Sequence, residues 1–449
     1  MNLTMQLGVA SAAAQIEGGG IRHTWSDWYD KGHIKDGSNP ARACDHWRRW
    51  REDIDLMADM GIGIYRFSIE WARLEPENGF YDGSAAVQYR EMIIYMKEKG
   101  IAPLLTLHHF THPIWFEEMG GFTNPENIPV FLKFVAYAVR TFGDLVDEYI
   151  TINEPNVFAV QGYFAGEFPP GEKSTKTALK VMSIMACCHI RAYQLIHQMR
   201  QEMGYSDTKV GFAHHMRVFT PENPNSTWQT TCTKTMAWLF QGALAKACLT
   251  GRFSAPMKRF VKIKPGEYSD FLALNYYTRT TVTGIKYGTK ADAPKNDLGW
   301  EIYPSGIVTC AAKLYEILPR PIYITENGTC DNTDSFRSRY IYDHLRALEK
   351  SKLPVTRYYH WCFTDNFEWC EGESSRFGLV HVDYETQERT IKNSGRFYME
   401  MIRTQTMTQE MIDDHPGASL YHYCEINEKQ SPPEPKMRTL LRIFGDRRD

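Results

Sequence analysis

Eight short apolar runs rich in β-branched residues alternate with longer segments of helical periodicity along most of the chain. This alternation is typical of βαβ units, in which consecutive strands lie parallel in one sheet. The expected strands are residues 5–10, 63–70, 102–109, 147–153, 209–215, 270–277, 321–326 and 354–361. Long loops allow a closed barrel to take up all 449 residues. The sequence therefore predicts an α/β fold: a single (β/α)8 TIM barrel with elaborated loops at the C-terminal face of the strands.

The segments between these runs carry helix signals. Asn124 can cap a helix that has Pro125 in its first turn, and Gly143 can end it. Between them, apolar residues recur at the spacing of one helix face. These residues are Ile128, Phe131, Val135, Val139 and Phe142.

The expected domain division falls near residue 404. No internal repeat and no linker rich in Pro, Gly or Ser divides the chain before Ser431, so one catalytic barrel is expected over residues 1–404. Residues 405–449 are expected to form an extension of unknown role that packs on the barrel. Its end is basic, and a charge run at a terminus is usually solvated. The cations are Lys436, Arg438, Arg442, Arg447 and Arg448.

Composition limits the classes of partner. A net charge of -3 leaves no basic surplus to neutralise a phosphate backbone, so no nucleic acid is expected. No apolar run approaches the roughly 20 residues of a membrane span, and residues 7–14 lack the basic start of a signal peptide. The ten cysteines show no C-x-x-C spacing, which favours reduced thiols and a cytoplasmic location. Whether copies of the chain form a homo-oligomer stays open.

Polar residues gather where the expected strands end. In a barrel of this type the active site is built at these C-terminal ends. Glu154 and Glu326 close the fourth and seventh strands, so they face each other across the mouth. Retaining glycoside hydrolysis needs two carboxyl groups about 5 to 5.5 Å apart, one to protonate the leaving oxygen and one to attack the anomeric carbon. The alternative is that either residue is an ordinary surface or ion-paired glutamate.

Other chemistries find weaker support. His108, His109 and His112 lack the H-E-x-x-H spacing of a zinc protease, so no metal is expected. No glycine-rich phosphate loop follows a strand, so no cofactor is expected either. His214 and His215 end the fifth strand and are interpreted as core or supporting groups.

Two pentapeptides resemble the signature motifs of glycoside hydrolase family 1, a β-glucosidase and β-galactosidase family built on a (β/α)8 barrel. Residues 151–155, Thr-Ile-Asn-Glu-Pro, resemble its T-x-N-E-P motif, and residues 324–328, Ile-Thr-Glu-Asn-Gly, resemble its I-T-E-N-G motif. The resemblance extends over about residues 5–402. It implies that Glu154 is the general acid/base and that Glu326 is the nucleophile.

The resemblance also implies roles around these two carboxyl groups. Arg66 and Tyr277 would keep Glu326 ionised, because a cation and a phenol donor favour the charged form. Asn153 and Asn275 would support catalysis beside them. The implied substrate-binding residues are Gln15, His109, Trp361, Glu368, Trp369 and Phe377.

The expected function is that of a retaining exo-β-glycosidase acting on small, unphosphorylated β-D-glucosides, with β-galactosides and β-fucosides left open. A transglycosylating member and a 6-phospho-β-glycosidase remain alternatives, although a carboxylate at Glu368 and Glu371 would repel a phosphate. A catalytically dead sugar-binding relative is disfavoured, because both required carboxylates are present. Cys362, where the family usually has serine, Ala72 and the segment 110–113 depart from the family pattern and leave the aglycone undefined.

Overall fold

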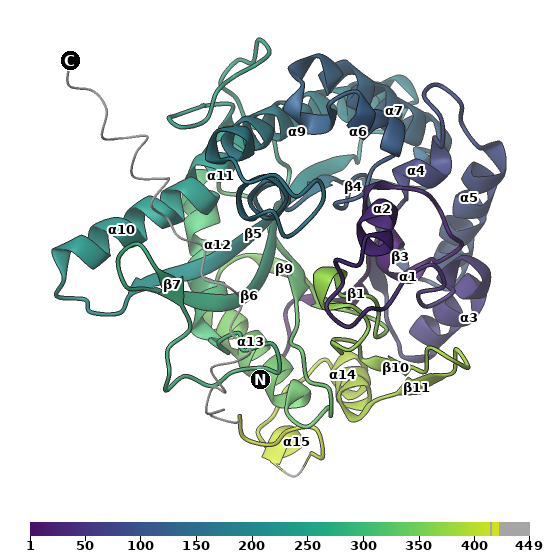
Figure 1. Cartoon of the computed structure of the whole chain (residues 1–449). Coiled ribbons are helices and arrows are strands. Elements are labelled where there is room, and N and C mark those ends of the chain that lie inside the picture. Colours follow the sequence, from purple (N-terminus) through teal and green to yellow (C-terminus); the bar gives the residue numbers. More distant parts are fainter. Residues whose placement is uncertain (414, 422–449) are drawn as a thin grey trace.

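A computed structural model describes residues 1–413 and 415–421 (Figure 1). Eight parallel strands form a barrel in the order β5-β4-β3-β2-β1-β9-β8-β6, and a parallel pairing of β5 with β6 closes it. Each of the eight expected strands is present, which confirms the predicted TIM barrel. They are β1 (Gln6–Ala10), β2 (Ile64–Ser68), β3 (Ala102–Thr106), β4 (Glu148–Asn153), β5 (Lys209–Pro221), β6 (Leu272–Val282), β8 (Ile322–Asn327) and β9 (Val355–Trp361).

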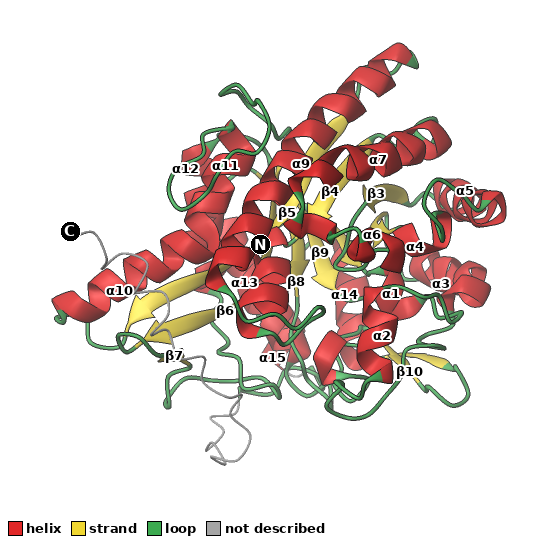
Figure 2. Cartoon of the chain, turned by 45° about the horizontal axis from the view of Figure 1, so that its top comes forward, coloured by secondary structure: helices red, strands yellow, loops and turns green. Residues whose placement is uncertain are grey.

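Helices surround the barrel and cover the outer face of its strands (Figures 1 and 2). The longer ones are α3 (His46–Asp59), α5 (Gly83–Glu98), α7 (Ile128–Phe142), α9 (Thr175–Glu202), α11 (Ala243–Thr250), α12 (Ser305–Ile317), α13 (Arg337–Ser351) and α14 (Asn393–Thr404). Shorter helices lie in the loops: α1 (Ala13–Ile16), α2 (Thr24–Asp30), α4 (Trp71–Leu74), α6 (Ile114–Glu118) and α8 (Pro155–Ala159).

The helix expected after Asn124 begins three residues later than its cap signal indicates. Asn124 caps a separate 3-10 turn (Pro125–Asn127), where its side chain accepts a hydrogen bond from the backbone N–H of Glu126 at 3.1 Å. α7 then starts at Ile128 and ends before Gly143. The apolar residues expected on one face of this helix are all buried, so the periodicity identified the packed face correctly and only the start was wrong.

Two strands continue beyond the barrel. β5 and β6 extend about six residues past the ends predicted for them, remain paired there, and add the antiparallel strand β7 (Tyr287–Gly288). Helix α10 (Thr227–Ala237) packs on this extension through Met236 and Cys232, which share a small core with Val282. The resulting arm projects from the barrel at the left of Figure 1. A separate hairpin, β10 (Val380–Val382) with β11 (Arg389–Ile391), was also not predicted.

The described part of the extension, residues 405–413 and 415–421, lies against both the N-terminus and α13. The backbone N–H of Leu3 donates to the carbonyl of Gln405 at 2.9 Å, and Ile412 in α15 (Glu410–Asp413) is fully buried. Tyr421 donates a hydrogen bond to Asp343 on α13 at 2.6 Å. The predicted basic tail, Lys436 to Arg448, lies outside the described residues. Among the described residues, no helix is long and apolar enough to cross a membrane.

Candidate active site

Glu154 stands at the turn between β4 and α8. Its φ of +44° is in the left-handed region, and Pro155 begins the helix directly after it. Such a backbone costs a non-glycine residue about 1–3 kcal/mol and is kept where the surroundings require it. The side chain is 5% exposed. Its Oε1 accepts hydrogen bonds from Asn275 Nδ2 at 2.9 Å and lies 3.0 Å from His215 Nδ1.

Glu326 lies near the end of β8 and has a different set of neighbours. Arg66 Nη1 lies 2.6 Å from its Oε1, and Tyr277 donates its phenol hydrogen to Oε2 at 2.7 Å. The turn that follows is tight: a Cβ on Gly328 would lie 1.8 Å from the carbonyl oxygen of Trp361. Only glycine fits there, which gives a physical reason for glycine at the end of the I-T-E-N-G segment.

A single hydrogen-bond network joins the two carboxyl groups. Asn153 Oδ1 accepts from Arg66 Nη2 at 2.6 Å and from Asn275 Nδ2 at 3.0 Å. Asn275 also contacts Glu154 and is the register partner of Glu326 between β6 and β8. The structure therefore brings together all six residues that the sequence placed at the reacting centre.

The two carboxyl groups share their titration. Burial raises the pKa of Glu326 to about 7, the charge of Glu154 adds to the rise, and Arg66 and Tyr277 act against it. Donors on the side of Glu154 favour its carboxylate. Two buried carboxyl groups this strongly coupled titrate as a unit. The directions of the pKa, raised for Glu326 and lowered for Glu154, place the shared proton on Glu326 in the unliganded pair.

The expected sugar-binding residues converge on the same mouth. Gln15 donates to the carbonyl of Phe367 at 2.7 Å and lies 3.5 Å from Glu368. His109 lies nearly parallel to Trp361 and Trp369, with ring centroids 5.7 and 6.0 Å away. Its Nε2 lies 3.1 Å from Asn153 Nδ2.

Two buried polar atoms at this mouth have no partner among the described residues: Gln15 Oε1 and His109 Nδ1. Buried polar atoms are normally hydrogen-bonded, so both are available to a ligand hydroxyl. Burial raises the pKa of Glu368 to about 8, with Glu326, Glu371 and Glu154 adding to the rise. At neutral pH Glu368 can therefore donate a hydrogen bond as well as accept one.

Phe377 is the one expected contact that stands apart from the network. It is buried and packs near Trp300, with ring centroids 6.0 Å apart, and Trp300 in turn meets Tyr277 edge-on at 5.8 Å. Trp300 has no motif around it in the sequence. It reaches the site only through the long connection between β6 and α12.

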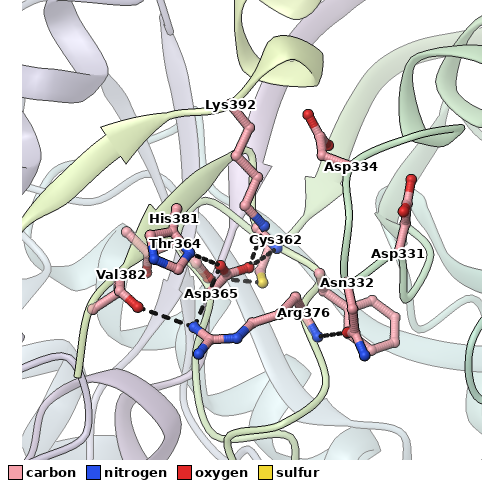
Figure 3. A network of polar contacts seen from close by, with 12 residues as sticks. Asp331, Asn332, Asp334, Cys362, Thr364, Asp365, Arg376, His381, Val382 and Lys392 are labelled. Atoms are coloured by element: carbon pink, nitrogen blue, oxygen red, sulfur yellow. Dashed lines mark hydrogen bonds and ion pairs between the residues drawn. The ribbon is translucent and has the colours of Figure 1, made fainter. Parts of the chain in front are cut away.

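The loop that carries Glu368 is anchored by a buried aspartate (Figure 3). Asp365 is fully buried; Lys392 Nζ lies 2.6 Å from Oδ1, and His381 and Arg376 point at Oδ2 from 3.3 and 3.5 Å. Burial would raise the pKa of Asp365, but the charge of Lys392, the contact with His381 and the charge of Arg337 outweigh it and hold the value at about 2. The site loop is thus tied to the β10–β11 hairpin and to the start of α14.

Of the three histidines considered for a metal, His109 lies in the mouth, and His108 and His112 contact each other apart from it. His112 Nε2 is 2.9 Å from Glu117, and His108 packs against His112 among phenylalanines. Within residues 1–413 and 415–421, no group of three or more His, Cys, Asp or Glu side chains is arranged to hold a metal ion.

His215 lies nearer to the proposed catalytic residues than its position in the sequence indicated. Interpreted as a core or supporting group, it lies within hydrogen-bond distance of Glu154, and Arg217 Nη2 lies 3.1 Å from its other ring nitrogen. Its place at the end of the fifth strand was a usable signal. A register shift between Ile150 and Asn153 on β4 determines which β5 residue meets Glu154.

Comparisons with known proteins agree with this geometry. The family model "Glycosyl hydrolase family 1" matches residues 4–407. A curated relative, β-glucosidase A of Thermotoga maritima, is 31% identical over 88% of this chain and 96% of its own length. Among solved structures, a β-glycosidase from Pyrococcus horikoshii superposes with a TM-score of 0.84 at 32% identity, covering 93% of this chain and 99% of that one. The Thermotoga maritima β-glucosidase in complex with glucoimidazole gives 0.83 at 30% identity, covering 90% and 100%.

Proposed function

The chain belongs to glycosyl hydrolase family 1, and from this membership we propose that it is a retaining exo-β-glycosidase acting on unphosphorylated β-D-glucosides. The observation that carries the proposal is the unequal setting of two linked carboxyl groups. Glu326 has a donor on each oxygen, one of them a cation. Glu154 is contacted on Oε1 and has Oε2 left for a proton. Glu326 is therefore suited to carry the negative charge, and Glu154 is suited to donate a proton.

The proposed reaction has two steps. In the first, Glu326 attacks the anomeric carbon, the glycosidic C–O bond breaks, and the proton of Glu154 passes to the leaving oxygen. This step requires the shared proton on Glu154, which is the reverse of its place in the unliganded pair, and Arg66 and Tyr277 stabilise the carboxylate of Glu326 once the proton has moved. In the second, Glu154 takes a proton from water, the water oxygen bonds to the anomeric carbon, and Glu326 leaves as a carboxylate. Two inversions preserve the β-configuration.

The glycone assignment is supported by the relatives and by the polar atoms of the mouth. The relatives reported above are named β-glucosidases or β-glycosidases. Gln15 Oε1, His109 Nδ1 and Glu368 can each bind a sugar hydroxyl. These groups also suit galactosides and fucosides, which stay open as further substrates.

A 6-phosphoglycoside is less suited to this mouth. Phosphate groups are bound by cationic side chains that are not already paired with carboxylates. Lys35 is ion-paired with Glu371, and Arg376 lies 3.5 Å from the carboxylate of Asp365. Transfer to an alcohol in place of water uses the same residues, so product analysis with added alcohol distinguishes it. The cysteines in the described residues are free thiols, which supports the predicted cytoplasmic location.

The test combines stereochemistry with a nucleophile variant. Proton NMR of the first product from an aryl β-glucoside should show the β-anomer. Glu326→Ala should lose nearly all turnover of that substrate while remaining folded at the assay temperature, and azide should restore activity by forming the α-glycosyl azide. An α-anomer as the first product of the wild-type protein, or wild-type rates in the variant, would sink the proposal. A 6-phosphoglucoside assayed in parallel checks the substrate class.

A further inference from the structure

His215 lies between two groups whose chemistry fixes its protonation. On one side, Arg217 Nη2 is 3.1 Å from His215 Nε2; on the other, His215 Nδ1 is 3.0 Å from Glu154 Oε1. An arginine guanidinium can only donate hydrogen bonds, so Nε2 must be the accepting nitrogen. In a neutral imidazole the hydrogen then sits on Nδ1 and points at Glu154.

Arg217 is held firmly enough for this role. Its backbone N–H donates to Gln241 Oε1 at 3.0 Å, and its carbonyl accepts from Gln241 Nε2 at 3.1 Å. The guanidinium lies 5.2 Å from the centre of the Phe240 ring and within reach of Thr280. Both the main chain and the side chain of Arg217 are therefore fixed against the imidazole.

The imidazole is also kept neutral. His215 is buried, and this burial lowers its pKa, with Arg217 lowering it further while Glu154 acts in the opposite direction. The ring lies nearly parallel to Tyr277, with centroids 6.0 Å apart, and meets Phe240 edge-on at 5.8 Å. A ring packed on two sides cannot turn freely.

We infer that Arg217 and His215 form a positioning relay that presents an N–H to Glu154 Oε1 and so assigns the catalytic proton to Oε2. This inference rests on the proposed acid/base role of Glu154. Asn275 donates to the same Oε1 at 2.9 Å. Because both donors occupy one oxygen, the proton that reaches the leaving group is carried by the other. Neither His215 nor Arg217 is placed on the substrate, and both act through Glu154.

The relay should also set the pH at which Glu154 loses its proton. An N–H donor stabilises the carboxylate and lowers the pKa of the acid; removing the donor raises that pKa. The other titratable or charged groups acting on Glu154 or coupled to it come from β2, β5, β6, β8 and the loop after β9. They are Arg66, His214, Tyr277, Glu326 and Glu368. None of these changes when His215 is replaced, so the shift reports the relay.

The first test reads the tautomer directly. In the full-length protein labelled with 15N-histidine, the His215 ring signals are identified by their loss in His215→Asn. We expect a protonated Nδ1 and a bare Nε2 at pH 7 to 8, above the usual pKa of histidine. A proton on Nε2 would overturn the inference whatever the enzyme does. In Arg217→Met the Nε2–H form should become populated; an unchanged tautomer there would remove Arg217 from the relay.

The second test reads the pH profile of kcat/KM. His215→Phe keeps a ring but loses the donor, so its alkaline limb should move up by about one pH unit, as expected for losing one hydrogen bond to a charged carboxylate. His215→Asn offers an amide N–H near the Nδ1 position and should return the limb toward the wild type. His214→Phe is the matched control, because His214 Nε2 contacts the carbonyl of Gln241 instead of Glu154. Its limb should move far less than that of His215→Phe, because His214 acts on Glu154 without a hydrogen bond to it.

Two outcomes of this second test count against the relay. The first is that His215→Phe folds and its alkaline limb lies at the same pH as that of the wild type. The second is that the alkaline limbs of His215→Asn and His215→Phe shift by the same amount. Melting curves identify a variant that does not fold, and the tautomer measurement on the wild-type protein then decides. Failure of the proposed function is a separate result: Glu154→Ala would keep full activity on substrates with poor leaving groups, while the tautomer result would stand.

Discussion

At the scale of single residues, the two carboxyl groups differ because of the donors around them. Glu326 lies against a cation and a phenol, and Glu154 against an imidazole and an amide. A guanidinium at 2.6 Å favours the charged form far more than a neutral amide does. The same residue type can therefore carry opposite roles within one hydrogen-bond network.

Removing the proposed acid should affect substrates according to their leaving groups. Glu154→Ala should lower kcat/KM by about 10²–10⁴-fold for an alkyl β-glucoside, the usual contribution of general acid catalysis. A dinitrophenyl β-glucoside, whose leaving group needs no proton, should lose far less in the glycosylation step. The ratio of the two substrates is the measurement, and Glu154→Gln, which keeps the shape without the acid, is the control. Equal losses on both substrates would contradict the acid role.

Sharing of one proton predicts a bell-shaped pH dependence of kcat/KM. Activity requires that the pair hold a single proton, so it falls when that proton is lost above the higher apparent pKa, at about 7. It also falls at low pH, where both groups are protonated. Tyr277→Phe removes a donor that favours the carboxylate of Glu326, so the alkaline limb should move to higher pH. An unchanged alkaline limb in this variant would show that the hydrogen bond from Tyr277 does not affect the pKa of the carboxyl pair.

Much of this site could be predicted from the sequence, because most of its residues lie at strand ends and in short motifs. Arg66 and Tyr277 lie on strands that were located correctly, and barrel geometry turns strand ends toward one mouth. The contact of His215 with Glu154 depends on a register shift in β4, which leaves no trace in the local pattern. Trp300 enters from a long loop whose path the sequence does not specify.

At the scale of elements, the loop after β9 is held by buried charge. Asp365 has contacts with Lys392, His381 and Arg376 and accepts a hydrogen bond from the N–H of Gly378 at 2.9 Å. The loop between Asp365 and Gly378 carries Glu368 and Trp369, two of the expected sugar-binding residues. The contacts of Asp365 therefore hold this part of the expected sugar-binding site in place.

Neutralising that anchor should damage both stability and substrate binding. Asp365→Asn leaves the side chain of Lys392, 10% exposed, without its buried partner. Breaking a buried pair typically costs about 3–5 kcal/mol. We expect a clearly lower melting temperature and a larger increase in KM than decrease in kcat. Asp383→Asn is the control in the nearby hairpin turn, where an exposed side chain accepts backbone N–H bonds that asparagine can also accept. A variant that melts like the wild type would show that the anchor is dispensable.

The elements differed in how well their sequence revealed them. Buried parallel strands are continuous apolar runs between helices, so all eight were located. The outer half of β5 is only partly buried, the outer half of β6 is buried but mainly polar in sequence, and strands of three residues such as β10 and β11 are too short for any periodicity to show. Pairing between distant segments, rather than local preference, determines these strands.

At the scale of the whole molecule, the segment after residue 404 pairs with the first residues of the chain. Asn2 forms an antiparallel bridge with Thr406, and the N–H of Met407 donates to the carbonyl of Met1 at 2.8 Å. Met407 is 2% exposed and Ile412 is fully buried, and both belong to the main hydrophobic core. These contacts support the proposal that the segment after residue 404 packs on the barrel.

Shortening the chain at two places tests how much residues 405–421 contribute. A chain ending at Thr404 loses the burial of Met407 and Ile412, each worth about 1.5–3 kcal/mol, and the hydrogen bond of Tyr421 to Asp343. A chain ending at Tyr421 keeps them. Both lack residues 422–449, so their difference reports 405–421 alone. We expect the shorter chain to melt roughly 5 °C or more below the longer one, with kcat/KM at 25 °C nearly unchanged, because no residue of this segment belongs to the network around Glu154 and Glu326. Equal melting temperatures would show that the segment lies on the barrel without stabilising it.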